Sequence, residues 1–219
     1  KERHVILSEI QLNHDDPERR LHHLLWGHQF RVHPYRYPIL GHPELLQRLT
    51  VDDLRQVHRA QYVPNNVLLV CVGDIDSVTL PDRVRQAFGT WPRGAAYEVV
   101  VAQDPPVISS RRVIETVPVQ AAYVVVGFPS TRLADPDLFP LDVLASIMGQ
   151  GRSARLHEEL VRKRRLVHSV SAWNYTPLDP GVFGVFLRAD PPQLTEAVER
   201  VLTALDDVAR RGVSEQELR

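Results

Sequence analysis

The run Glu2-Arg3-His4-Val5-Ile6-Leu7-Ser8-Glu9-Ile10 lies within a helix that the sequence predicts over residues 1–14. At 100° per residue, the apolar residues of this helix share one arc. Glu2 and Glu9 are seven residues apart and project within about 20° of each other on that same face. A carboxylate in an apolar stripe is unfavourable unless it is paired, hydrogen-bonded or bound to a metal. The alternative is that both acids reach solvent or an arginine from a frayed helix end.

This run resembles the segment that supplies the third zinc ligand in the pitrilysin/insulinase family of peptidases, the inverted zincins. In that family a His-x-x-Glu-His motif supplies two zinc ligands and the glutamate that activates water. The later acid of a Glu-(six residues)-Glu pair is the third ligand. The resemblance implies that Glu9 binds zinc and that Glu2 is its supporting acid. It also implies Zn²⁺ as the cofactor and peptides as the substrate.

The resemblance extends over nearly the whole chain. The matching motifs are a loop, an Asn-Asn turn, a strand ending in Gly-Asp and a Gly-rich turn followed by Ser-Ala-Arg-Leu. They are His33-Pro34-Tyr35, Tyr62-Val63-Pro64-Asn65-Asn66, Val70-Cys71-Val72-Gly73-Asp74 and residues 149–156. Each motif is a weak signal by itself, but their order and spacing together make the match specific.

The sequence departs from the family pattern in two places that concern function. It contains no His-x-x-Glu-His motif, so two zinc ligands and the catalytic base are missing from this chain. The positions of a substrate-gripping arginine and tyrosine hold Val161 and His168, and Arg162 is one residue out of register. The resemblance therefore leaves Arg162 and His168 as candidates for substrate binding. We expect the chain alone to be inactive and to bind zinc weakly or not at all.

The predicted elements begin with helices and continue as alternating strands and helices. Helices are expected at 17–30, at 50–62 after a capping box of Thr50 and Asp53, at 80–88 and at 138–148. A break at 149–151 precedes a further helix to about residue 164, and an amphipathic stripe predicts a last helix from 194 to 208. Strands are expected at 67–72, 111–117, 121–128, 167–175 and 181–188. This order predicts an α+β fold in which helices pack on one face of antiparallel sheets. The resemblance implies metallohydrolase domains like those of the mitochondrial processing peptidase.

Residues 92–107 contain three prolines and a glycine and are predicted to be an inter-domain linker. The resemblance makes residues 1–91 the C-terminal half of a catalytic-type domain. It makes residues 108–219 a second, homologous domain that is truncated at its C-terminus. Both ends are interpreted as cuts through a longer protein, and residues 214–219 look like the start of a helix.

Composition is that of an ordinary globular protein, with 43% hydrophobic and 24% charged residues. The formal net charge of −1 gives no reason to expect a nucleic-acid partner. No apolar run approaches the roughly 20 residues of a membrane span. The only cysteine, Cys71, lies in an apolar run and is predicted to be buried. A single cysteine leaves the compartment open, with cytoplasm and periplasm both compatible.

Two further groups of residues admit a functional interpretation that we consider weaker. Four histidines cluster in the sequence, but their spacings fit no metal-ligand pattern, which favours surface or core positions: His22, His23, His28 and His33. The basic run at 162–165 could touch nucleic acid, but a solvated helix end that interacts with the helix dipole is the simpler interpretation.

Two functions remain open from the sequence. One is part of a zinc metalloendopeptidase that cuts peptides in a closed chamber between two homologous halves. The other is a non-catalytic subunit that holds substrate or serves a structural role in a heterodimer. Glu2 and Glu9 favour the first. A chain that has the two acids but lacks the Arg/Tyr pair resembles the metal-bearing subunit of a heterodimer. The alternative is a homodimer that uses His168 and Arg162.

Overall fold

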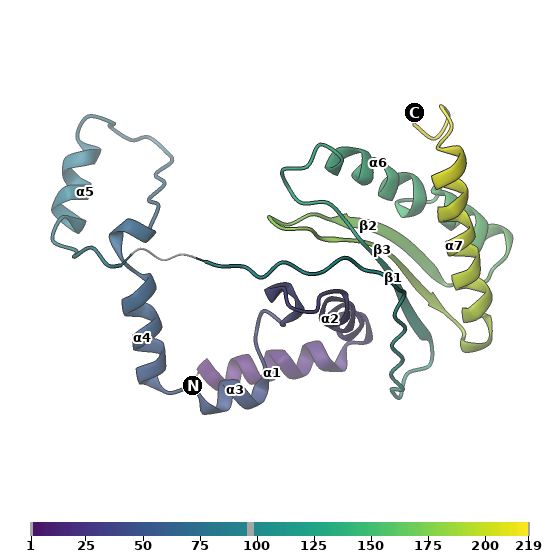
Figure 1. Cartoon of the computed structure of the whole chain (residues 1–219), viewed down its shortest axis with the longest axis horizontal. Coiled ribbons are helices and arrows are strands. Elements are labelled where there is room, and N and C mark those ends of the chain that lie inside the picture. The colour runs from purple at the N-terminus through teal and green to yellow at the C-terminus, as the bar shows by residue number, and fades with distance from the viewer. Residues whose placement is uncertain (1, 96–98, 219) are drawn as a thin grey trace. The chain divides into compact units, whose positions relative to one another are not determined.

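The structure is a computed structural model that describes residues 2–95 and 99–218, which form two compact units (Figure 1). Unit 1 comprises residues 1–3 and 41–101, and unit 2 comprises residues 4–40 and 102–219. One boundary between the units, at 101/102, falls inside the predicted linker. Residues 96–98 of that linker, Lys1 and Arg219 lie outside the described residues. The division into a catalytic-type domain, a linker and a second domain stays a prediction.

Unit 2 is built on a three-stranded antiparallel sheet with the strand order β1-β3-β2. The strands are β1 (Ala122–Pro129), β2 (Ser169–Tyr175) and β3 (Val182–Ala189). All three were predicted from the sequence, with bounds that differ by at most two residues. Val185 of β3 lies opposite Val126 of β1 and Ala172 of β2. Because directly opposed residues point to the same face of a sheet, this register sorts the side chains of the three strands onto two surfaces.

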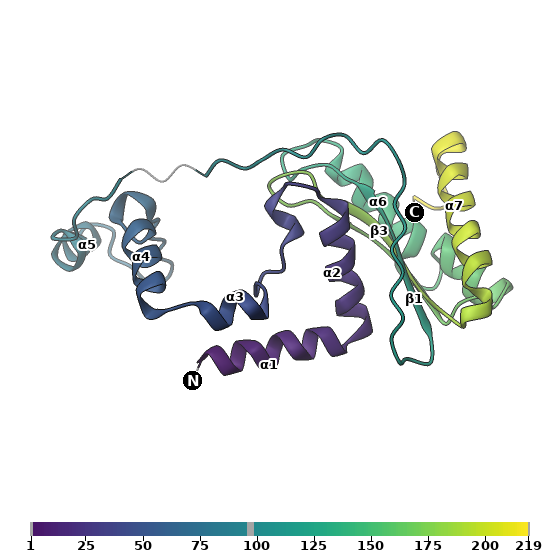
Figure 2. The ribbon, with the colours of Figure 1, turned by 60° about the horizontal axis from the view of Figure 1, so that its bottom comes forward.

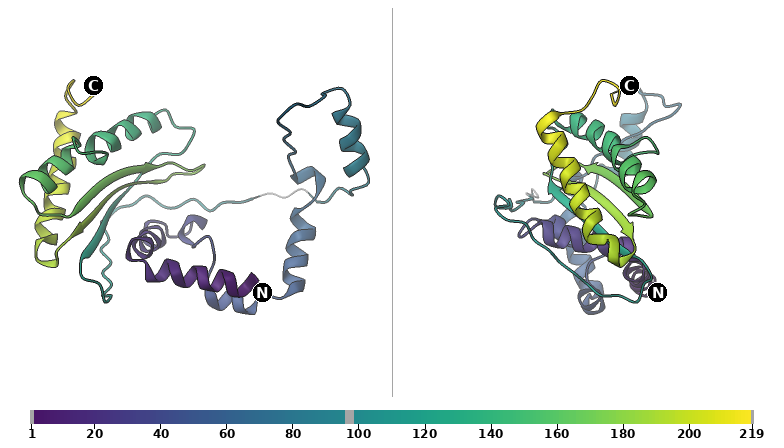
Figure 3. Two further views of the ribbon diagram at one scale, coloured as in Figure 1. Left: turned by 180° about the vertical axis from the view of Figure 1, so that it is seen from behind. Right: turned by 90° about the vertical axis from the view of Figure 1, so that its right-hand side faces the viewer.

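The main core lies on the face that carries Val185 and Leu187, both fully buried. Helices α6 (Leu138–Gly149) and α7 (Leu194–Arg211) cover this face, and Figure 3 shows α7 lying across the strands. Their contributions to the core include Met148 of α6 and Val201 of α7. The predicted helix-break at 149–151 is confirmed. Gly149 is required there, because a Cβ atom would collide with the backbone of β2.

Helix α2 (Pro17–Gln29) lies on the opposite face of the sheet (Figure 2). It starts after Asp16, whose side chain accepts the N–H groups of residues 18 and 19. A Cβ atom on Gly127 would come within 2.5 Å of Leu25, so the glycine lets α2 approach β1 closely. The predicted α+β fold with an antiparallel sheet is confirmed, and α2 adds a helix on the second face.

Unit 1 consists of short helices joined by loops. They are α3 (Pro43–Arg48), α4 (Val51–Gln61), η2 (Pro64–Asn66) and α5 (Leu80–Phe88). The predicted capping box at the start of α4 is present, because Thr50 and Asp53 exchange side-chain and backbone hydrogen bonds. The side chain of Asn65 likewise exchanges two hydrogen bonds with the backbone of Gly94, at 3.0 and 3.3 Å.

Two predicted strands and the predicted burial of Cys71 are wrong for this chain. Residues 67–72 have no strand partner in the part of unit 1 that the structure describes, and Leu68 is 87% exposed. Cys71 is exposed with them. Residues 111–117 also form no strand; the segment is held to α2 by an Arg20–Glu115 ion pair of 2.6 Å. Apolar character alone makes no strand, because the backbone groups also need a ladder partner.

The remaining helical elements are α1 (Glu2–Asp15), η1 (Pro34–Arg36), the π-helix η3 (His157–Lys163) and η4 (Pro191–Gln193). None of the described helices is long and apolar enough to cross a membrane.

Candidate functional site

Glu2 and Glu9 both lie on α1, as predicted, and both side chains are exposed. They are two turns apart, about 10.5 Å along the helix axis. Val5 and Leu12, which flank them, are also exposed, whereas Ile10 is half-buried. The acids therefore project from a partly apolar side of α1 that is open to solvent.

Neither acid has a hydrogen bond or ion pair within residues 2–95 and 99–218, and these residues contain no cluster of three metal-binding side chains. An exposed carboxylate is a suitable zinc ligand, so Glu9 fits the expected role chemically. A catalytic zinc ion takes three protein ligands, however. The described residues offer one or two, and the remaining ligands would have to come from elsewhere.

Arg162 and His168 lie at either end of the segment that joins η3 to β2. Arg162 pairs with Glu158 at 2.8 Å, and His168 Nε2 lies 3.0 Å from a carboxylate oxygen of Asp190. Both side chains are about half exposed or more. Val161 instead packs against the hydrophobic core. Of the two neighbouring residues, Arg162 is thus the one that can reach a ligand.

The π-helical geometry of η3 bears on the one-residue offset between Arg162 and the arginine position of the family pattern, which Val161 holds. The N–H of Arg164 donates to the carbonyl of Glu159, five residues earlier, at 3.1 Å. A π turn contains one residue more than an α turn, so it rotates the side chains that follow it relative to an α-helix. Sequence alignment to a regular helix could not detect this, because the hydrophobic pattern is compatible with either helix type.

Two of the clustered histidines, His22 and His33, take part in packing, whereas His23 and His28 are exposed. No metal-binding group forms among the four in the portion of the chain that the structure describes. The ring of His22 stacks on Trp173 with centroids 5.5 Å apart, and burial against this neighbour lowers the pKa of His22. The side chain of His33 is only 4% exposed. It belongs to an aromatic cluster with Phe30 and Tyr35.

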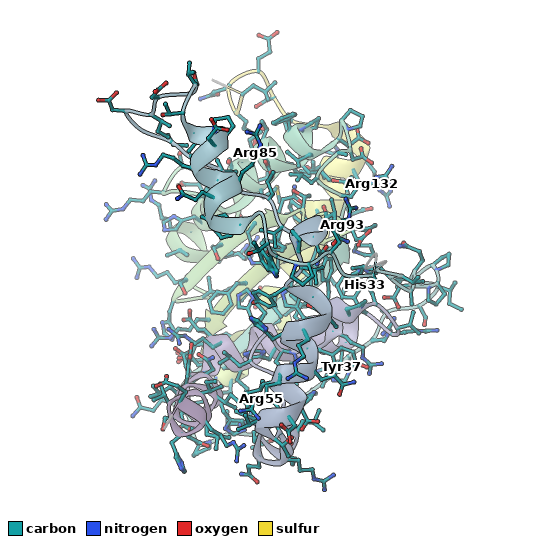
Figure 4. All side chains as sticks on the ribbon, turned by 90° about the vertical axis from the view of Figure 1, so that its left-hand side faces the viewer. His33, Tyr37, Arg55, Arg85, Arg93 and Arg132 are labelled. Atoms are coloured by element: carbon teal, nitrogen blue, oxygen red, sulfur yellow. The ribbon has the colours of Figure 1, made fainter. Side chains whose placement is uncertain are left out.

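Two carboxylates that sequence reasoning did not single out fix the segment around His33, which Figure 4 labels. Asp104 accepts the backbone N–H groups of residues 31, 32 and 33 at 2.6, 3.0 and 3.1 Å. Asp179 lies 3.2 Å from His33 Nε2. Partial burial would raise the pKa of Asp104, but the three N–H donors together outweigh it and lower the pKa. The only sequence signal for this arrangement was the motif at 33–35.

Known proteins resemble this chain in sequence over nearly its whole length. Residues 48–219 match the family described as the peptidase M16 inactive domain. An uncharacterized zinc protease of Streptomyces coelicolor is 28% identical over 225 residues, which cover 99% of this chain and 48% of that protein. The zinc protease PqqE of Helicobacter pylori is 25% identical over 96% of this chain and 48% of its own length. The chain thus spans about half the length of these curated relatives.

Solved structures share the fold. The crystal structure of a protease from Helicobacter pylori superposes with a TM-score of 0.85 at 23% identity, over 99% of this chain and 54% of that one. The resemblance drawn from the run at 2–10 and the motifs after it is thereby confirmed at the level of family and fold. The family model covers far more than half of the sequence, and the chain belongs to the peptidase M16 inactive domain family.

Proposed function

We propose that this chain is part of a zinc-dependent metalloendopeptidase and that Glu9 is one of the zinc ligands. The observation that carries the proposal is the pair of exposed acids on α1, with no partner in the described residues and with exposed apolar neighbours. The acids are hydrated as they stand, whereas the exposed apolar residues beside them would be stabilised by a cover, so this surface suits a metal site completed by another part of the protein. The zinc-protease names of the relatives support the same conclusion.

In this proposal each acid of α1 has a distinct role. The zinc ion, when bound, would polarise a peptide carbonyl and activate water. Glu9 would hold the ion. Glu2, about 10.5 Å away along the helix axis, is poorly placed to share it and would support the site through hydrogen bonds. The other ligands and the catalytic base would come from a His-x-x-Glu-His segment outside this chain.

If this chain contacts the substrate itself, Arg162 and His168 would do so. Both are exposed, and both are held by carboxylates, Glu158 and Asp190, that a peptide's own carbonyl and carboxylate groups could replace. Exposed ion pairs of this kind contribute little to stability, on the order of 0–1 kcal/mol. Little free energy is therefore lost when a substrate group replaces the carboxylate partner. We propose that a homologous subunit closes over the substrate from the other side. A heterodimer in which the partner supplies the gripping residues is favoured, because Val161 packs against the core. A homodimer in which Arg162 and His168 bind the substrate is the alternative.

The second candidate function is a non-catalytic subunit that holds substrate or serves a structural role. The description of the matched family as an inactive domain favours it. The two candidates differ in what the full-length protein should do. A catalytic parent protein retains zinc and cleaves unstructured peptides, alone or with its partner, whereas a non-catalytic parent does neither.

The test uses the full-length protein with and without a candidate partner. Light scattering after size-exclusion chromatography gives the assembly, and cleavage of an unstructured peptide gives activity. We expect zinc-dependent cleavage that needs the partner and is restored by zinc after chelation. Full activity from the protein by itself, lost in His168→Ala, would instead establish the homodimer. Zinc-dependent cleavage by the 219-residue chain alone would refute the assignment of the missing ligands.

A further inference from the structure

Three residues form a row across the sheet of unit 2, which we call the Arg188 row. Tyr123 of β1 lies directly opposite Arg188 of β3, and Ser169 of β2 lies opposite Arg188 on the other side. Successive residues of a strand point to opposite faces, and Leu187 lies in the core under α6 and α7, so Arg188 points to the face that α2 covers. The Cβ atoms of opposed residues are about 5 Å apart, so the three side chains are neighbours.

Helix α2 contacts this face at a different place. The ring of His22 stacks on Trp173, which lies opposite Gly184. Gly184 and Arg188 are four residues apart on β3, so about 14 Å of strand separates the two rows. Consistent with this distance, the two polar members of the Arg188 row are exposed and the tyrosine is half-buried. The row is therefore open to a ligand.

The guanidinium of Arg188 has an aromatic neighbour but no acidic one. Its Cζ atom lies 5.9 Å from the centroid of the Tyr123 ring. Within residues 2–95 and 99–218, neither this guanidinium nor the Ser169 hydroxyl has a hydrogen-bond or ion-pair partner. The tyrosine ring restricts the orientation of the guanidinium and leaves its N–H groups free to donate.

These groups suit one carboxylate. A planar guanidinium binds a carboxylate through two parallel N–H bonds, and a hydroxyl one strand away can donate to the same group. Nucleic acid is a poorer match, because its binding relies on several cations that follow a row of phosphates. The formal net charge of the chain, −1, provides no such excess.

The Arg188 row adjoins the residues through which this chain would contact a substrate. Ser169 directly follows His168, and the N–H of His168 donates to the Arg188 carbonyl at 2.8 Å. The nearby acid Asp190 lies against the His168 ring, with 3.0 Å between Oδ1 and Nε2, and not against the arginine. A peptide that binds at His168 therefore has the free guanidinium within reach of its neighbouring side chains.

We propose that Arg188 and Ser169 bind the side-chain carboxylate of an aspartate or glutamate in the peptide substrate. The inference rests on the proposed function, which makes the ligand a peptide, and it adds a preference for acidic residues beside the segment bound at His168. Tyr123 is a positioning residue, because it acts by orienting the guanidinium.

The experiment compares the affinity of two labelled, unstructured peptides for the full-length protein, alone and with the candidate partner, by fluorescence anisotropy. The peptides are identical except that every glutamate of one is glutamine in the other. A chelator prevents zinc-dependent cleavage during the measurement, and salt at about 0.15 M screens charges more than about 8 Å apart. We expect the acidic peptide to bind about tenfold more tightly, because charge-assisted hydrogen bonds are stronger than neutral ones.

Variants of the arginine separate a specific bond from general charge attraction. Arg188→Gln should make the two affinities equal, and Arg188→Lys should keep only part of the preference because it retains the charge without the planar fork. Arg132→Gln is the matched control. Arg132, labelled in Figure 4, is also exposed and has no ion-pair partner in the described part of the chain, but it follows the far end of β1. The tenfold preference should survive in this variant.

Ser169→Ala covers the case in which Arg188→Gln unfolds the sheet, which tryptophan fluorescence would reveal. Loss of the hydroxyl from this exposed position should reduce the preference about threefold. Equal affinities for the parent protein, no binding of either peptide, or equal losses in the Arg188 and Arg132 variants would overturn the inference.

The result also separates this inference from the proposed function. Zinc-dependent cleavage without a preference for the acidic peptide would remove only the carboxylate site. A preference for the acidic peptide in a full-length protein that binds no zinc would refute the peptidase and support the carboxylate site.

Discussion

The Nε2 atom of His33 lies 3.2 Å from Oδ2 of Asp179, and the two residues are 146 positions apart in the sequence. The Nδ1 atom of the same ring accepts the backbone N–H of Tyr35 at 3.1 Å. An imidazole that accepts at Nδ1 carries its proton at Nε2 when neutral, so it donates to the Asp179 carboxylate. The ring thus ties the segment after α2 to the loop between β2 and β3.

His33→Phe should destabilise unit 2 by about 1–3 kcal/mol. The substitution keeps a ring in the aromatic cluster but leaves the Tyr35 N–H and the Asp179 carboxylate without their partner. Asp179→Asn should cost less, because the amide oxygen can still accept from Nε2. Denaturant unfolding followed by tryptophan fluorescence measures both losses. His23→Phe, at an exposed position of α2, is the matched control. Equal stability of the His33 and His23 variants would refute the structural role of this histidine.

Asp104→Asn should also destabilise unit 2, and the loss should depend on pH. Hydrogen bonds to a charged acceptor are worth more than those to an amide, and about 2 kcal/mol is expected for the three donors at neutral pH. Because the folded-state pKa of Asp104 is lowered, its stabilising effect is present above the unfolded-state value near 3.9. It is lost as the pH falls through the folded-state value.

Unfolding curves of the parent and Asp104→Asn at several pH values between about 2 and 7 test this linkage. The two stabilities should converge at the acid end. Asp206→Asn, which removes an exposed carboxylate paired with Arg210, is the control and should change little at any pH. A difference between parent and Asp104→Asn that stayed constant across the range would mean that the charge of Asp104 is unimportant.

Arg165→Gly should stabilise unit 2 by about 0.5–1 kcal/mol. Arg165 has a φ of 53° and is the one residue other than glycine with positive φ in the described ranges 2–95 and 99–218. A side chain in this conformation costs roughly 1–2 kcal/mol, which the greater freedom of glycine in the unfolded chain offsets in part. Arg165→Ala retains the strained Cβ and should give no gain. A more stable alanine variant than glycine variant in thermal unfolding would count against the strain.

Cys71 should react with a thiol reagent in the native 219-residue chain at the rate of an accessible thiol. It is the only cysteine, so a colorimetric thiol assay with dithiobis-nitrobenzoate reports on this position alone. Exposure follows from the absence of a strand partner for residues 67–72 in the described part of unit 1. Modification only after addition of denaturant would mean that the run is covered.

Features that depend on neighbours in the sequence were predicted well. The Thr50–Asp53 capping box, the strands of unit 2 and the break at Gly149 all follow from local hydrogen bonding and hydrophobic periodicity. The acids of α1 were found because seven residues make two helical turns.

Features that depend on distant parts of the chain were not predicted. Asp104 and Asp179 lie 71 and 146 residues from His33, and no local pattern marks either as its partner. The run at 67–72 has the composition of a strand, but a strand also requires a neighbour, which composition cannot supply. The π-helix η3 differs from an α-helix by one residue per turn, a difference too small to appear in the hydrophobic pattern.

The zinc content of purified full-length Glu9→Gln, compared with that of the parent protein and of Glu2→Gln, tests the role of α1 most directly. A neutral amide is a much poorer zinc ligand than a carboxylate, so we predict a sharp loss of zinc and of peptidase activity in Glu9→Gln. Glu2→Gln should lose about 10–100-fold in activity with a smaller effect on metal content. Equal zinc occupancy in Glu9→Gln and the parent protein would remove Glu9 from the metal site.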